Sequence, residues 1–197
     1  PVQSFTTVYP GDVKYVDLTG ENIIDANDRK AIGYSTTAPD IYYNFHLGAE
    51  YKGLGLDAMF QGVGRWTGFM TTNGLYRSAV ATNTLSQYLY ENSWSAERGN
   101  TESALFPRLS TTSNANNDLN STLNMFDRSY IKLRYVELYY HLPKSLLNKL
   151  SVINNIKLYV RGTDLFTADH LDKADAASYG VAQPLTRSVQ LGAALTF

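Results

Sequence analysis

An acidic stretch at residues 17–28 has the residue types and the spacing of a calcium-binding loop. Oxygen-bearing side chains recur at the first, third, fifth, ninth and twelfth positions, where loops of this kind place their Ca²⁺ ligands. Ca²⁺ takes about 6–8 hard oxygen ligands, and this spacing could supply most of them. The candidate ligands are the side chains of Asp17, Thr19, Glu21, Asp25 and Asp28 together with the main-chain carbonyl of Ile23.

The same loop departs from the usual pattern at two positions. Asn22 stands where glycine normally makes the sharp turn, although Asn is the next best residue for a positive φ. Asp28 is shorter than the glutamate that usually binds bidentately at the last position. The alternative interpretation is a solvated acidic loop that is closed by Asx turns.

Aromatic side chains are the second group that could carry binding chemistry. They make up 13% of the chain and include 15 tyrosines, which suits strands and surfaces that are half apolar and half wet. Those near predicted strand ends are interpreted as girdles that anchor a barrel at the edges of a bilayer. Within the long polar stretch at residues 64–127, five aromatic side chains could instead stack on sugars or contact a covering protein: Trp66, Phe69, Tyr76, Tyr88 and Trp94.

Signals for several other function classes are missing. The sequence has no Gly-x-Ser-x-Gly elbow, P-loop or His-Glu-x-x-His motif, so we do not expect an enzyme. It has no cysteine, which excludes disulfides and thiolate metal sites. A formal net charge of -1 leaves no electrostatic footprint for nucleic acid.

The elements that would position these residues are predicted to be β-strands, because apolar and polar side chains alternate. The phase of the third segment changes by one residue, which predicts a β-bulge near Tyr135 and Val136. A two-residue turn at residues 53–54 joins the first two segments, and short helices are expected within 75–98 and at 144–147. The five segments are 41–52, 56–61, 128–142, 156–163 and 188–197.

The connections between these strands alternate in length. Residues 53–54 and 143–155 form the shorter ones, whereas 64–127 and 167–186 are long and polar. Outer-membrane barrels have short periplasmic turns and long extracellular loops, so the pattern predicts an all-β, antiparallel transmembrane barrel. No run approaches about 18 apolar residues, which excludes a transmembrane helix. The predicted lumen-facing residues are His46, Glu50, Arg134, Lys157 and Arg161.

Five strands are too few to close such a barrel, since even small closed barrels use about 8. We therefore expect the chain to be a section of a longer polypeptide. The alternative from the pattern alone is a soluble, carbohydrate-binding β-sandwich, which also has alternating strands between turns.

Three stretches resemble the end of the SusC/RagA-like family. Residues 10–17 read PGDVKYVD and are followed by DANDR at 25–29, similar to the family's PGD-x-x-Y-x-D and ID-x-x-DR. Residues 51–53 and 60–62 read YKG and FQG, and 158–166 read LYVRGTDLF, similar to a family stretch that ends in NLF. Thr19, Glu21 and Asn22 depart from the family's loop pattern.

The resemblance implies a C-terminal section of a roughly 22-stranded, TonB-dependent transporter in the bacterial outer membrane. Such a protein would import glycan or peptide oligomers through a plugged barrel, with a SusD-like lipoprotein as a lid. Residues 1–40 would form an extracellular loop, and residues 41–197 the last strands. A barrel of the same family with a structural or adhesive role is the other possibility.

The last strand also resembles the signal that the outer-membrane assembly machinery reads on its clients. It alternates apolar side chains and stops on an aromatic residue, whereas chain termini usually fray into polar tails. The residues expected to form this signal are Val189, Leu191, Leu195 and Phe197.

Overall fold

The computed structural model describes residues 2–73, 75–78, 84–148, 152–171 and 185–197. The chain divides into two compact units, one made of Pro1–Ile32 with Gly68–Phe126 and the other of Gly33–Thr67 with Asp127–Phe197. No helix in the described part of the chain is long and apolar enough to cross a membrane.

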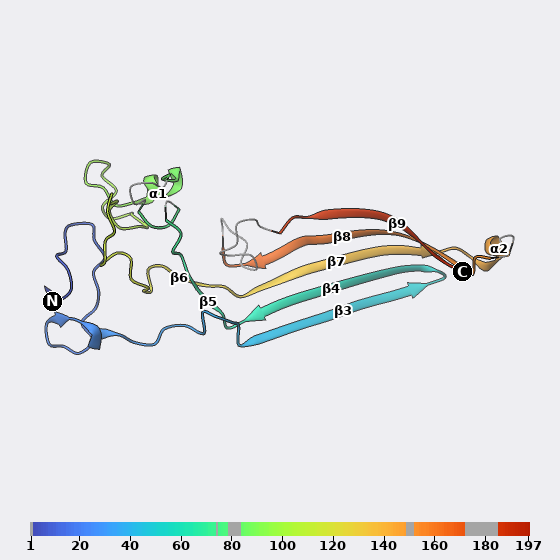
Figure 1. Ribbon diagram of the computed structural model, residues 1–197, viewed down its shortest axis with the longest axis horizontal. Helices are drawn as coiled ribbons and strands as arrows, with labels where there is room; N and C mark the ends of the chain where they lie inside the picture. The colour runs from blue at the N-terminus through green and yellow to red at the C-terminus, as the bar shows by residue number, and fades with distance from the viewer. Residues whose placement is uncertain (1, 74, 79–83, 149–151, 172–184) are drawn as a thin grey trace. The chain divides into compact units, whose positions relative to one another are not determined.

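The second unit is built on one five-stranded antiparallel sheet (Figure 1). Each strand pairs with the next of these five along the chain, as in an up-and-down meander. The all-β prediction and its five strands are therefore confirmed. The strands are β3 (Ile41–Tyr51), β4 (Leu54–Gly64), β7 (Tyr130–His141), β8 (Asn155–Asp169) and β9 (Ser188–Thr196).

The turn between β3 and β4 lies one residue earlier than residues 53–54. Tyr51 pairs with Leu54, which leaves Lys52 and Gly53 as the two loop residues. Both have positive φ, 51° and 86°, as the tight turn that best matches the twist of a hairpin requires. Gly53 adopts this conformation without steric cost, and it thereby fixes the register of the hairpin.

The predicted bulge is present, and it lies at Arg134. Between Leu133 and Tyr135 the pairing of β7 with β8 shifts, and β7 also shifts against β4. The extra residue puts Tyr135 and Glu137 on the face that carries Lys132, so the prediction placed the phase change one or two residues too late. On β8 the residue Asp164 has a φ of 52° and forms an ion pair of 2.8 Å with Arg134 across the irregularity.

One face of this sheet is apolar and exposed to an extent that is unusual for a sheet in water. Cross-strand partners put leucines, valines and aromatic residues in rows, and Phe45 stacks on Phe60 with ring centroids 4.7 Å apart. These side chains keep much of their surface uncovered, for example Leu47 at 59%, Leu56 at 50% and Leu191 at 81%. A contiguous apolar surface of this kind marks a site that something else covers.

The first unit is mostly irregular, with short elements. A parallel pair joins β1 (Val2–Gln3) to β2 (Ile23–Ile24), and η1 (Ala26–Asp28) follows it. The helix α1 (Gln87–Asn92) begins at Ser86, whose side chain accepts a hydrogen bond from the Leu89 N–H. β5 (Thr67–Phe69) and β6 (Met125–Asp127) form a second two-stranded sheet, and α2 (Lys144–Leu147) belongs to the second unit. Both expected short helices are confirmed.

Three tyrosines of the large sheet lie over glycines on the neighbouring strand. Tyr139 covers Gly55, Tyr43 covers Gly62 and Tyr159 covers Gly192, each across a directly paired position. A Cβ at Gly55 would lie 2.1 Å from Cζ of Tyr139, so the ring fills the space that a side chain would need. Each pair packs a ring flat on the sheet and helps to hold the register.

We predict that Gly55→Val destabilises the sheet, because the valine would displace the Tyr139 ring. Overpacking of this kind typically costs about 1–3 kcal/mol. The measurement is the temperature at which the full-length protein loses its compact migration on electrophoresis. Gly48→Val is the matched control, since a Cβ there meets nothing closer than 3.9 Å. Equal unfolding temperatures for the two variants would contradict the role of the tyrosine.

Candidate functional site

The acidic loop brings four of the six predicted calcium ligands together around one hydroxyl group. Oγ1 of Thr19 lies 3.2 Å from Oδ1 of Asp17, 3.2 Å from Oε1 of Glu21 and 3.3 Å from Oδ1 of Asp28. The other two predicted ligands also have contacts within the first unit. Asp25 caps η1 by accepting from the Asn27 N–H at 2.7 Å, and Ile23 pairs with Val2 in the small parallel sheet.

Main-chain N–H groups donate hydrogen bonds to the carboxylates of this loop. Asp17 accepts from Gly20 at 2.6 Å and Asn22 at 2.7 Å, and Asp28 accepts from Asp25 at 2.9 Å. The hydrogen bond from the Asp25 N–H, with others from Leu18 and Thr19, lowers the pKa of Asp28. Among the described residues, no group of three or more His, Asp or Glu side chains is spaced to hold a metal ion. Asx turns therefore account for the geometry, and calcium binding stays a prediction.

The opposite face of the large sheet carries paired charges. Glu137 on β7 lies 2.5 Å from Nζ of Lys157 and 2.6 Å from a guanidinium nitrogen of Arg161, both on β8. Its side chain is only 3% exposed, so the two cations and their stems enclose it. Register explains the arrangement, because Glu137 and Arg161 are direct cross-strand partners.

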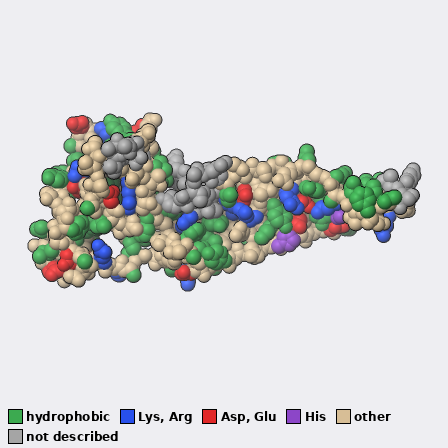
Figure 2. All heavy atoms as spheres, in the orientation of Figure 1, with side chains coloured by type: hydrophobic (Ala, Val, Ile, Leu, Met, Phe, Trp, Pro, Cys, Tyr) green, Lys and Arg blue, Asp and Glu red, His purple; other side chains and the backbone are tan. Residues whose placement is uncertain are grey.

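The network continues to the edge strand β3. His46 contacts Asp57 of β4, and the Tyr135 hydroxyl lies 3.5 Å from Nε2 of the same histidine. The Tyr139 hydroxyl donates to Glu50 at 3.1 Å. In the view of Figure 2, basic and acidic side chains lie next to one another over this sheet.

Each of the two cations of this face lies against an aromatic ring. Nζ of Lys157 lies 4.2 Å from the centroid of Tyr139, and the guanidinium of Arg161 lies 5.2 Å from that of Tyr135. The predicted residues His46, Glu50, Lys157 and Arg161 thus share one connected face, while Arg134 lies in the bulge. Whether this face lines a lumen stays a prediction.

The five loop aromatics have packing roles of their own. Tyr76 is buried, Tyr88 meets Phe106 edge to face at 5.8 Å, and Trp94 lies against Gly11. Trp66 is covered by the guanidinium of Arg128, 3.6 Å from its ring, and Phe69 is half-buried in β5. A ligand contact for any of them stays a prediction.

Sequence reasoning did not foresee the role of Asp12, which organises the first unit. Its side chain, 1% exposed, lies 2.7 Å from Arg108 and accepts from the Tyr9 N–H at 2.9 Å and from Asn117 at 2.9 Å. Burial raises the pKa of Asp12, but the hydrogen bond from Tyr9 and the contacts with Arg108 and Asn117 outweigh it, so that the pKa is lowered. The carboxylate therefore stabilises this unit at neutral pH, and its contribution is lost as pH falls through the lowered pKa.

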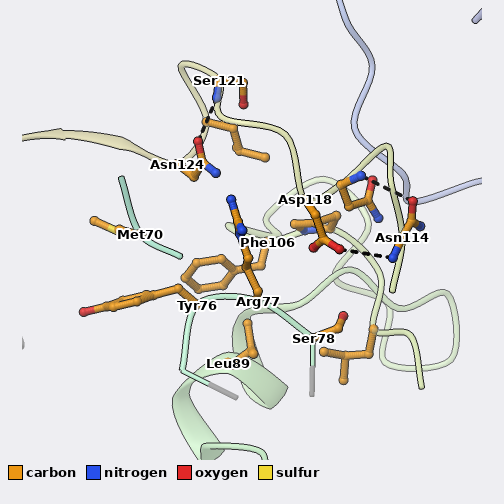
Figure 3. A pocket seen from close by; sticks show the side chains of 14 residues that line it. Met70, Tyr76, Arg77, Ser78, Leu89, Phe106, Asn114, Asp118, Ser121 and Asn124 are labelled. Atoms are coloured by element: carbon orange, nitrogen blue, oxygen red, sulfur yellow. Dashed lines mark hydrogen bonds between the residues drawn. The ribbon is translucent and has the colours of Figure 1, made fainter. Parts of the chain in front are cut away.

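Figure 3 shows a small cavity in the same unit. Arg77 enters it beside Phe106, and Asp118 lies on the opposite side, where it accepts from the Asn114 N–H at 3.1 Å. Its volume is about 30 Å³, the share of one water molecule in the liquid. The cavity suits bound water and is far too small for an oligomer.

We predict that Glu137→Gln destabilises the sheet, because Lys157 and Arg161 would then face each other without a counter-charge. Lys157 and Arg161 are 28% and 43% exposed, so solvent screens part of the repulsion and the expected loss is roughly 1 kcal/mol. Thermal unfolding of the full-length protein in detergent would measure the loss. Glu50→Gln is the matched control, since Glu50 is exposed and accepts only from Tyr139 among the bonds described. The prediction fails if both variants unfold at the wild-type temperature.

Comparison with known proteins identifies relatives of this arrangement. No family model matches the chain. A TonB-dependent receptor of Formosa agariphila is 29% identical over 167 residues, which cover 84% of this chain and 15% of the receptor. The chain thus spans a small part of the relative that it matches.

Solved structures of a peptide importer are similar in fold to most of this chain. The RagAB peptide importer in its open-open state aligns over 88% of this chain and 19% of that chain, with a TM-score of 0.64 and 25% identity. Its closed-closed state gives a TM-score of 0.66 and 26% identity over the same shares. These relatives are receptors and transporters and not enzymes. These matches confirm the resemblance to a section of a SusC/RagA-like transporter that was drawn from the sequence motifs.

Proposed function

We propose that this chain forms part of the barrel wall of an outer-membrane, TonB-dependent transporter that imports glycan or peptide oligomers. The observation that carries the proposal is the two-faced sheet. One face is apolar and exposed, as lipid requires, and the other is polar with its charges paired. This is the arrangement of side chains on a strand that separates a bilayer from an aqueous lumen.

The sheet edges support a barrel rather than an isolated sheet. Within the described residues, the outer edges of β3 and β9 have no partner strand. Main-chain groups that face lipid must be hydrogen-bonded, so further strands of the same barrel would have to pair with both edges. A barrel of roughly 22 strands would satisfy this need.

The names of the relatives support the finer parts of the proposal. Formosa agariphila has a TonB-dependent receptor of this type, and RagAB is a peptide importer. By analogy, TonB would supply energy through a plug, and a SusD-like lipoprotein would cover the extracellular mouth. The loop aromatics Trp66, Phe69, Tyr76, Tyr88 and Trp94 would lie in that region.

Two other functions predict different properties. A barrel with a structural or adhesive role would have the same sheet but would not take up oligomers. A soluble carbohydrate-binding sandwich would cover the apolar face with a second large sheet. In the residues that the structure describes, the only other sheets are two-stranded.

Uptake by intact cells tests the proposal. Labelled peptide oligomers and labelled glycan oligomers would be offered separately to wild-type cells, to cells without the full-length protein and to cells without TonB. We expect one oligomer class to accumulate in wild-type cells only. Equal accumulation in all three strains would leave the structural barrel as the better explanation, and a protein that is soluble without detergent would support the sandwich.

We also propose, on the spacing of its ligands, that the acidic loop binds Ca²⁺ after its carboxylates turn away from the main chain. Thermal unfolding with added Ca²⁺ and with chelator measures this. At roughly 100 times the dissociation constant, a bound ion would add about 2.7 kcal/mol to the stability. Asp17→Asn should abolish the shift and Asp40→Asn, outside the loop, should preserve it. An unchanged unfolding temperature with and without Ca²⁺ would remove the proposal.

A further inference from the structure

A cavity at the hairpin-turn end of the large sheet gathers positive charge. Its volume is about 410 Å³, and it lies among the β3–β4 turn, the end of β7, α2 and the start of β8. Two lysines, Lys52 and Lys144, and the imidazole of His141 line it. The nine described lining residues include no Asp or Glu, so the cavity favours an anion.

The uncharged polar groups of this cavity are hydrogen-bonded within its wall. Nδ1 of His141 and Oδ1 of Asn155 are hydrogen-bonded at 3.1 Å, which orients the ring. Asn154 lies beside this pair, and its N–H donates to the Thr196 carbonyl at 2.7 Å, which ties the cavity wall to β9. The two ammonium groups are therefore the donors that this cavity offers to phosphate oxygens.

The exposed apolar face of the sheet reaches the edge of this cavity. Direct pairing places Tyr51, Leu54 and Tyr140 in one row across β3, β4 and β7, and they are 73%, 53% and 40% exposed. The ammonium group of Lys52 lies 5.1 Å from the centroid of the Tyr51 ring, and Gly53, which lines the cavity, lies against the Tyr140 ring. The surface therefore changes from apolar, through Tyr51, to cationic at Lys52, whereas His141 lies on the opposite face of β7 from Tyr140.

This order of chemistry matches a single kind of molecule. A phospholipid has acyl chains, a polar interface that tyrosines favour, and a phosphodiester that lysines attract. Free phosphate would use the lysines but would leave the apolar row unexplained.

We propose that this cavity binds the phosphodiester of an anionic phospholipid, with the acyl chains lying along the row of Tyr51, Leu54 and Tyr140. The inference rests on the proposed function, because only a sheet embedded in a bilayer would meet lipid there. It adds a specific lipid site to the wall of the barrel, at the end of the sheet with the short turn.

The test uses the full-length protein in nanodiscs of phosphatidylcholine mixed with phosphatidylglycerol, and native mass spectrometry of the lipids that stay bound after extraction. We expect phosphatidylglycerol to be enriched over phosphatidylcholine. The double variant Lys52→Gln, Lys144→Gln should lower that enrichment by roughly 25-fold, since each lysine near an anionic lipid surface contributes roughly a factor of five. The control is Lys14→Gln, Lys30→Gln, which removes the same charge outside the cavity.

Three results would overturn the assignment. Equal retention of the two lipids by the wild-type protein would do so without the need for a variant. Unchanged enrichment in the double variant, shown to be folded by its compact electrophoretic migration, would do so as well. Displacement of phosphatidylglycerol by inorganic phosphate in the same lysine-dependent way would point to a free phosphate site. Each of these leaves uptake by intact cells untouched, so the two proposals fail separately.

Discussion

The strand register of the large sheet is the constraint on which the rest of the second unit depends. Side chains alternate with a period of two, so a slip of one residue would turn every apolar side chain to the polar face. The Lys52–Gly53 turn fixes the pairing of β3 with β4, and the bulge at Arg134 corrects the phase of β7. Tyr135 lies two residues before Glu137, whereas Lys132 lies five residues before it. Without the bulge, the odd spacing would place Lys132 on the face opposite to Glu137 and Tyr135.

Correct register in turn creates the contacts that hold the sheet without a buried core. Its apolar face is exposed, so stability in the isolated sheet comes from the hydrogen-bond ladder and from cross-strand side-chain pairs. Glu137 is enclosed by two cations. Tyrosine rings cover glycines at positions where a larger residue would clash with the ring. Each carboxylate of the polar face named above has a partner on the same face.

The first unit is held together in a different way. Its buried set is small, with Leu89 and Tyr76 among the few apolar side chains that are almost covered. Asp12 joins Arg108 and Asn117 about a hundred residues along the chain, and Asn116 is fully buried beside them. A polar network of this type specifies one arrangement, because an unpaired member would be costly at low dielectric.

Local alternation determined the five strands, their approximate bounds and the two kinds of face, because period two is a property of the sequence itself. The phase change in 128–142 likewise required a bulge, but its position at Arg134 was decided by pairing with β4 and β8. Pairings between distant segments were beyond the sequence: Glu137 with Lys157, Asp12 with Arg108, and Tyr139 over Gly55. The spacing of the acidic loop predicted six ligands, and the tertiary structure adds that Asp25 caps η1 and that Ile23 pairs with Val2, while calcium binding stays a prediction. Spacing along a chain sets which side chains can meet, whereas competition from main-chain N–H groups, visible only in the tertiary structure, decides which do.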